Sequence, residues 1–146
     1  MPASTKNTRF ALGVHLLTLL GAADGVAQSS EVLSHSAGSN PVHVRRVLGS
    51  LREAGLVASR HGPGGGWTTV GDPATTTLAD VWDAVHGDAP VLDLHMAAPG
   101  CPVGRAIQDE LRAVDRDALR AVRDELARTT LAELVGRTDA AALLAG

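Results

Sequence analysis

The chain has 146 residues, of which 45% are apolar and 20% charged, with a formal net charge of −3. This balance excludes a disordered chain and fits one compact core with an extension. No apolar run is long enough to cross a bilayer, and Met1 to Lys6 lacks the apolar stretch of a secretory signal, so we expect a cytoplasmic protein without a membrane partner. One cysteine, Cys101, excludes an internal disulfide.

Charge is distributed unevenly along the chain. Residues 1–70 contain six Lys or Arg and three acids, whereas residues 71–146 contain seven Arg and thirteen acids. DNA affinity depends on the local potential at the contact face rather than on the total charge. The asymmetry is therefore compatible with a basic DNA-reading part on an acidic body.

The front of the chain predicts three helices. Apolar residues at spacings of three and four indicate a first helix over 7–21 with one buried stripe. Ser29 can cap a short second helix that Gly38 ends, because its hydroxyl can accept a bond from a first-turn amide. Asn40 caps a third helix that begins with Pro41 and closes at Gly55. The stripe of the first helix consists of Phe10, Ala11, Val14, Leu17 and Leu20.

The next segment adds a hairpin to these helices. The second and third helices, joined by a short turn, have the outline of a helix-turn-helix. Strand-like runs at 56–60 and 67–70 flank the turn-rich stretch 61–66, which predicts a β-hairpin, the wing. The expected fold is mainly α with this small hairpin: a winged helix-turn-helix followed by a long dimerisation helix.

The rear of the chain predicts a helix over 78–87, a loop over 88–100, a long amphipathic helix from Pro102 and a short last helix from Thr129 or Thr130. We expect residues 1–87 to form the DNA-binding domain, 88–102 a loop that can act as a sensor, and 103–146 the dimerisation helix and C-terminal helix. The apolar stripe of the long helix is Val103, Ile107, Leu111, Val114, Ala118, Val122 and Leu126.

The third helix carries the candidate base-reading face. Val44, Val47, Leu48 and Leu51 follow helical spacing and should pack inward, which leaves the opposite face for DNA. Arg can grip guanine, Asn can pair with adenine and Val can touch a thymine methyl. On an isolated helix such arginines would indicate only a solvated face, but a basic, glycine-rich wing next in the chain favours DNA. The candidate DNA contacts are Ser29, Asn40, Val42, His43, Arg45, Arg46, Ser50, Arg60, His61, Gly64 and Gly65.

Three stretches, 40–48, 51–57 and 60–67, resemble the Rrf-two family of bacterial winged-helix repressors, and the Gly-Pro-Gly-Gly-Gly wing is the most specific part of that likeness. The resemblance implies a homodimer with paired long helices, each reading part binding half of a roughly palindromic site. The apolar stripe suits this role independently, and packing within its own chain is the alternative. The candidate interface residues are Ile107, Leu111, Val114 and Val122.

A sensor is less well defined by the sequence. Cluster-binding members of the family have three cysteines in the loop that corresponds to 88–104, whereas this chain has Cys101 alone. One cysteine with His95 falls short of an iron-sulfur ligand set, so we expect no cofactor, and no metal motif joins these residues to His86. The helix start and Arg105 would favour a Cys101 thiolate and a redox switch; a buried structural cysteine is the equal alternative.

The function predicted is that of a sequence-specific DNA-binding transcription regulator, by resemblance a repressor, with double-stranded DNA and a second copy as partners. Its small-molecule effector is unknown, and Trp82, on an apolar face, is expected in the core rather than at an effector site. A winged-helix protein-interaction module without DNA contact is the main alternative. The sequence shows neither a nucleophile paired with a base nor a convergent set of acids, so no motif in it indicates an enzyme.

Overall fold

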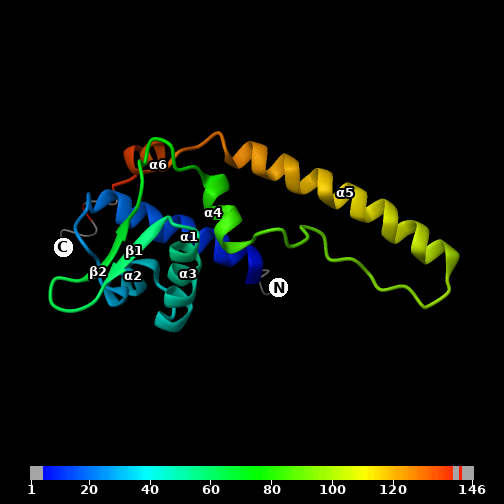
Figure 1. Ribbon diagram of the computed structural model, residues 1–146, viewed down its shortest axis with the longest axis horizontal. Coiled ribbons are helices and arrows are strands. Elements are labelled where there is room, and N and C mark those ends of the chain that lie inside the picture. Colours follow the sequence, from blue (N-terminus) through cyan, green and yellow to red (C-terminus); the bar gives the residue numbers. More distant parts are fainter. Residues whose placement is uncertain (1–4, 140–141, 143–146) are drawn as a thin grey trace.

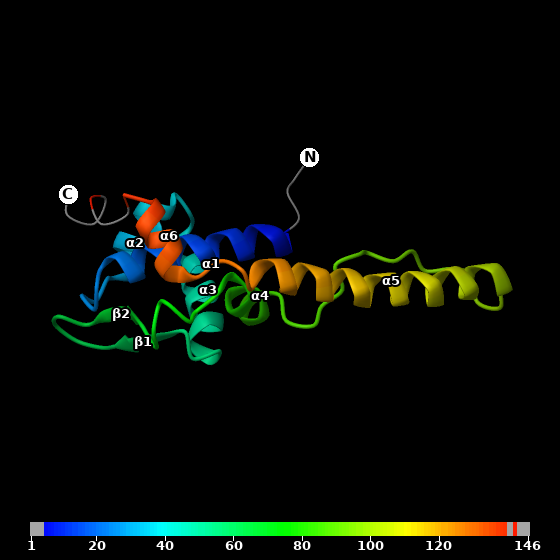
Figure 2. The same ribbon diagram turned by 90° about the horizontal axis from the view of Figure 1, so that it is seen from above.

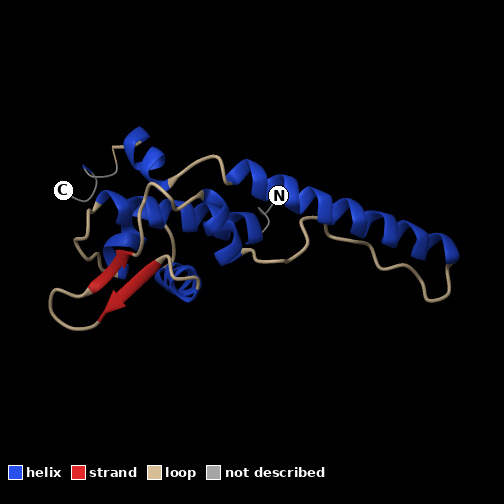
Figure 3. Ribbon diagram, turned by 45° about the horizontal axis from the view of Figure 1, so that its top comes forward, coloured by secondary structure: helices blue, strands red, loops and turns tan. Residues whose placement is uncertain are grey.

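The computed structural model describes residues 5–139 and 142 of the chain. Within these residues, six helices and one two-stranded antiparallel hairpin follow each other in the predicted order, which confirms the expected fold class (Figure 1, Figure 3). No helix of this described part is both long and apolar enough to cross a membrane. The elements are α1 (Thr5–Ala22), α2 (Ser30–Ala37), α3 (Pro41–Glu53), β1 (Val57–Arg60), β2 (Gly66–Thr69), α4 (Leu78–Val85), α5 (Pro102–Leu126) and α6 (Leu131–Arg137).

Helix α1 is the centre of the core. It contacts α2, α3, α4, α6 and β2, so it is buried on several sides rather than along one stripe. The predicted single stripe is therefore wrong in part: Ala11, one of its members, is exposed, because the surrounding elements leave only a narrow strip of α1 open. The buried apolar residues of α1 are Leu12, Leu16, Leu17, Leu19 and Leu20.

The two helices of the helix-turn-helix begin at the predicted caps. The Ser29 hydroxyl accepts a hydrogen bond from the Val32 amide at 3.1 Å, and Asn40 Oδ1 accepts one from the Val42 amide at 2.8 Å. Such caps satisfy amides that the helix itself leaves without partners. Helix α3 ends at Glu53, slightly before the predicted Gly55. Its inward face is confirmed, because Val44, Val47, Leu48 and Leu51 are all fully buried.

The wing is a β-hairpin whose base is hydrogen-bonded to the segment just before α2. In it β1 pairs with β2, and Trp67 exchanges two backbone hydrogen bonds with Gln28, at 3.0 and 2.8 Å. This close approach explains Gly66: it has a φ of 136°, and a Cβ there would lie 2.6 Å from the Gln28 carbonyl oxygen. Only glycine fits both conditions. The base of the hairpin is therefore held against the start of the helix-turn-helix.

Helix α6 returns to the body and packs on α1. Thr77 caps α4 and Thr130 caps α6, each in a reciprocal capping box with an acid three residues later. Two backbone bonds join the helix starts, from the Leu131 amide to the Thr76 carbonyl at 2.7 Å and from the Leu78 amide to the Thr129 carbonyl at 3.0 Å. Leu131 itself belongs to the core.

The loop after α4 runs outward from the body to a far tip, and α5 returns alongside it, so that the two form a projecting arm (Figure 1, Figure 2). Three contacts attach the loop along this length. The Leu92 amide donates to Asp115 at 2.6 Å, and Gln108 donates to the His95 carbonyl at 3.0 Å. Arg123 binds Asp88 at 2.9 Å. One side of α5 is thus covered by its own chain.

Candidate nucleic-acid interface

The outward face of α3 presents basic and apolar side chains to solvent. Val42 is 62% exposed, and Arg45 and Arg46 are also exposed. Neither arginine forms an ion pair with any described residue, although ion pairs are frequent on α5. A protruding helix with free guanidinium groups and a small apolar side chain carries the group types that read base edges in a major groove.

The flanks of α3 are less accessible than the sequence indicates. Ser50 and His43 are half-buried, and the Ser50 hydroxyl accepts a hydrogen bond from Arg9 of α1 at 3.3 Å. Ser29 and Asn40 are exposed but use their side-chain oxygens as helix caps. A hydroxyl or amide that caps a helix still has donor capacity left, so these residues retain the means to contact a phosphate.

The wing tip places Arg60, His61 and Gly64 at the surface. Gly65 is half-buried, and its amide donates to the Gly62 carbonyl at 3.0 Å, so this amide is engaged inside the turn. A Cβ on Gly65 would lie 2.2 Å from the Arg60 carbonyl oxygen. The glycine therefore contributes the tight shape of the wing rather than a free donor.

A basic cleft lies between α3 and the wing, with a volume of about 330 Å³. Arg45 comes from the middle of α3, Arg52 from its last turn, and Arg60 with His61 from the hairpin. Sequence reasoning overlooked Arg52. The seven-residue spacing of Arg45 and Arg52 is the signal that could have found it, because two turns of helix bring such residues to one face.

Cys101 caps α5. Its Sγ accepts a hydrogen bond from the Gly104 amide at 3.4 Å, and the residue is half-buried beside an apolar groove of about 270 Å³ between the loop and α5. Gly104 permits the loop to lie this close, because a Cβ there would be 2.3 Å from that of Ala97. His95 is exposed at the same groove. The two predicted sensor residues thus line one groove.

The candidate dimer residues divide into two groups. Ile107 and Val114 are 53% and 45% exposed, as is the neighbouring Val103 at 66%. Leu111 and Val122 are half-buried, and Leu111 lines the groove under the loop. The predicted stripe is therefore partly covered by the loop of its own chain and partly open to solvent.

Arg123 joins three segments at the root of the arm. Its guanidinium donates to Asp83 of α4 at 2.6 Å and to Asp88 of the loop at 2.9 Å. The hydrogen bonds to Asp88 and then to Asp83 raise the pKa of Arg123 above its ordinary value. This group therefore stays charged and holds α4, the loop and α5 together.

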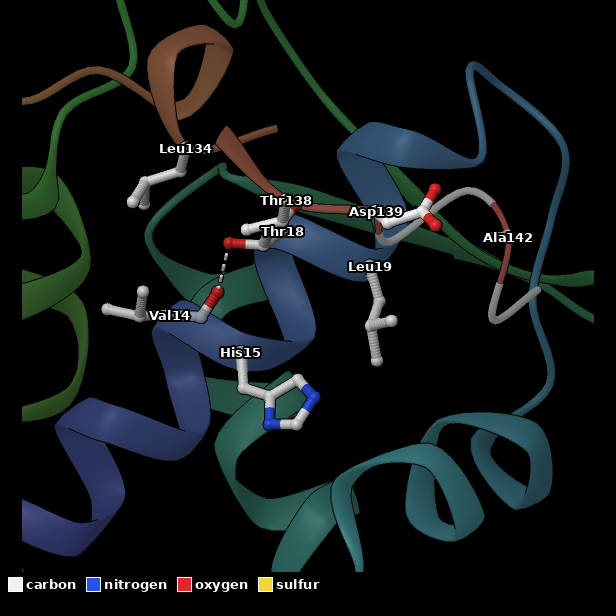
Figure 4. A pocket seen from close by; sticks show the side chains of 8 residues that line it. All are labelled: Val14, His15, Thr18, Leu19, Leu134, Thr138, Asp139 and Ala142. Carbon is white, nitrogen blue, oxygen red and sulfur yellow. Dashed lines mark hydrogen bonds between the residues drawn. The ribbon is translucent and has the colours of Figure 1, made fainter. Parts of the chain in front are cut away.

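A further cavity, which the sequence did not indicate, lies between α1 and the end of α6 (Figure 4). Its volume is about 530 Å³, and its walls are mainly apolar, with His15 and Asp139 exposed at its edge. Thr18 donates its hydroxyl to the Val14 carbonyl at 2.7 Å and is thereby satisfied within α1.

Trp82 is 6% exposed and stacks on His86, which places it in the core as predicted.

A capped helix-turn-helix whose second helix presents unpaired arginines, followed by a basic wing, defines the class of winged-helix transcriptional regulators. The profile of the Rrf2 family, described as "Iron-dependent Transcriptional regulator", matches residues 6–137. YwnA of Bacillus subtilis (strain 168), which is named an HTH-type transcriptional regulator, is 34% identical over 130 residues, covering 88% of this chain and 96% of YwnA. The chain belongs to the Rrf2 family of transcriptional regulators, which are not enzymes.

Solved structures with the same fold include two that cover most of this chain. One, described as a DNA binding protein, is 32% identical with a TM-score of 0.65, covering 86% of this chain and 97% of its own. CymR, the global cysteine regulator of B. subtilis, is 24% identical with a TM-score of 0.64, covering 95% of this chain and 99% of its own. The predicted family is thereby confirmed.

The family description refers to iron, and the residues of this chain do not fit an iron-sulfur cluster. Thiolates are the main cluster ligands, and Cys101 is the single cysteine of the sequence. Across the described residues, no group of three or more His, Cys, Asp or Glu side chains could hold a metal ion. The Sγ of Cys101 instead supports the start of α5.

Proposed function

We propose that the protein is a homodimeric repressor that acts in the cytoplasm on a roughly palindromic operator, with α3 in the major groove and the wing beside the backbone. The observation that carries this proposal is the free basic face of α3, where Arg45 and Arg46 have no ion-pair partner among the described residues. The candidate base contacts are Asn40, Val42 and Arg46, with His43, Arg45 and Ser50 at the flanks.

The exposed apolar residues of α5 support a dimer. Val103, Ile107 and Val114 would lie against a second copy, because solvent exposure of such large apolar side chains at helical spacing is costly unless a partner covers them. Residues 1–87 then read DNA, and the segment 103–146 contributes the interface through α5. Two reading parts related by a two-fold axis would bind two half-sites.

Cys101 is the proposed redox-responsive residue. The Cys101 Sγ accepts a hydrogen bond from the Gly104 amide and so caps α5. Oxidation of this Sγ would disturb that hydrogen bond and thereby the packing of the loop on α5. The expected consequence is weaker operator binding after mild peroxide, restored by a thiol, and no such response in Cys101→Ser. A Cys101→Ser protein that still loses binding would contradict this part of the proposal.

Binding of the purified protein to its own upstream DNA, compared with a shuffled duplex over a salt series, tests the main proposal. Arg46→Ala should weaken specific binding by about 1 to 3 kcal/mol if this side chain reads a base. Arg116→Ala, an exposed arginine of α5, is the matched control and should have no effect. Equal binding of both duplexes, here and at other genomic sites, would favour a protein-interaction module instead.

The direction of regulation needs its own measurement. A repressor that covers its promoter should lower transcription from that template in a purified system in proportion to operator occupancy. Arg46→Ala should relieve this effect at the same protein concentration. Increased transcription on binding would identify an activator.

A further inference from the structure

The cleft between α3 and the wing concentrates positive charge from separate elements. Arg45, Arg52, Arg60 and His61 line it, and none of the described residues in its wall is acidic. The remaining wall residues are small, hydroxyl-bearing or aromatic. This differs from α5, where exposed arginines such as Arg112 and Arg120 pair with an aspartate of the same helix. The charges in the cleft are thus left for a partner outside the chain.

Arg52 is fixed in position without being neutralised. Its guanidinium carbon lies 5.4 Å from the centre of the Trp67 ring, and its Nη1 donates to the Ser59 hydroxyl at 3.2 Å. Trp67 is in turn anchored to Gln28 by two backbone bonds. Stacking on an aromatic face restrains an arginine and leaves most of its five N–H donors free. The side chain is therefore arranged in advance for an anion.

We propose that Arg52, with Arg45 and Arg60, binds a single phosphodiester of the DNA backbone that passes through this cleft. The inference rests on the proposed function: if α3 enters the major groove and the wing lies beside the minor groove, the strand that separates the two grooves must cross between them. The cleft occupies that position, since α3 contacts β1 directly and the hairpin extends from the end of α3 (Figure 3). Arg52 then fixes the register of the protein and reads no base.

The test compares Arg52→Ala with the wild-type protein on the upstream duplex and on the shuffled duplex. Loss of a charge-assisted phosphate contact should weaken both complexes by the same factor, roughly tenfold, and lower the slope of log affinity against log salt by about one. Arg52→Lys should keep the slope and recover part of the affinity, because a lysine retains the charge but not the planar fork. Arg112→Ala on α5 is the control and should bind like the wild type.

A second measurement identifies the phosphate itself. Methylphosphonate groups, which remove one backbone charge at a time, are placed along the upstream duplex. One substituted position should weaken the wild-type protein but have no further effect on Arg52→Ala, since the two changes remove the same contact. An unchanged affinity and slope for Arg52→Ala, while the wild type still distinguishes the two duplexes, would overturn this inference and leave the proposed function intact. A wild type with no preference would instead refute the proposed function.

Discussion

The DNA-reading body, which consists of α1 to α4, the hairpin and α6, differs from the α5 arm in how completely it buries its apolar side chains. In the body, side chains such as Leu33, Leu48 and Leu51 are fully buried among α1, α2 and α3. In the arm, Asp115 is the buried residue of α5, while Ile107 and Val114 remain open to solvent. The body therefore closes an apolar core within a single chain, whereas α5 has no buried apolar side chain and leaves Ile107 and Val114 exposed.

The two regions also use their arginines differently. On α5, Arg112 and Arg120 pair with acids one turn away, so their charge is balanced on the surface of the same helix. In the body, Arg45, Arg46 and Arg60 form no ion pair with a described residue. Positive charge without an ion-pair partner is therefore concentrated on the side proposed to face DNA, although the net charge of the chain is negative.

Val114→Glu should have the largest effect, because it would place an unpaired charge in the proposed interface. We expect dimer affinity to fall by about 3 to 5 kcal/mol while the body keeps its fold. Sedimentation equilibrium measures the first and circular dichroism the second. Arg116→Glu, two residues along and on the far side of α5, is the matched control and should remain a dimer. An unchanged Val114→Glu dimer would remove α5 from the interface.

Leu51→Ala should destabilise the body by about 2 to 5 kcal/mol, since it removes a fully buried side chain and leaves a cavity. Urea unfolding of the two variants Leu51→Ala and Leu92→Ala sharpens the comparison. Leu92 is 37% exposed on the loop beside α5, so its truncation should cost much less. Equal losses would show that the arm contributes to the same cooperative core as the body.

Asp115→Ala should release the loop from α5. It removes the acceptor of the part-buried hydrogen bond from the Leu92 amide, and the loss of such a bond costs about 0.5 to 1.5 kcal/mol. Hydrogen exchange of the amides in residues 88–101 should speed up locally. Asp115→Asn keeps an acceptor and should behave more like the wild type, and Asp117→Ala, at an exposed position, should leave the exchange unchanged.

Arg123→Ala should have the smallest effect, less than about 1 kcal/mol, because its partners Asp83 and Asp88 are largely exposed. The raised pKa means that the folded state favours the charged form, so the contribution is present below the ordinary arginine pKa and is lost only at strongly alkaline pH. Thermal unfolding should therefore show sensitivity to salt but not to pH in the neutral range. A loss that persists at high salt would indicate packing rather than charge.

Much of the reading part could be predicted from local signals. Ser29 and Asn40 mark helix starts, and the spacing of Val44, Val47, Leu48 and Leu51 fixes which side of α3 faces outward. These signals act within a turn or two of the chain, so no knowledge of distant residues is needed. The environment of Ser50 could not be predicted, since its partner Arg9 lies 41 residues away on another helix.

Local signals along the chain were enough to predict the order of the elements, the inward face of α3 and the glycine-rich wing, because caps, periodicity and backbone restrictions are local properties. The three-dimensional arrangement was needed to show that α1 is surrounded, that Asp115 holds the loop and that Arg52 stacks on Trp67 within a basic cleft. Each of these depends on segments meeting in space. Spacing along the chain does not specify such meetings, because many arrangements of the same helices satisfy the same apolar pattern.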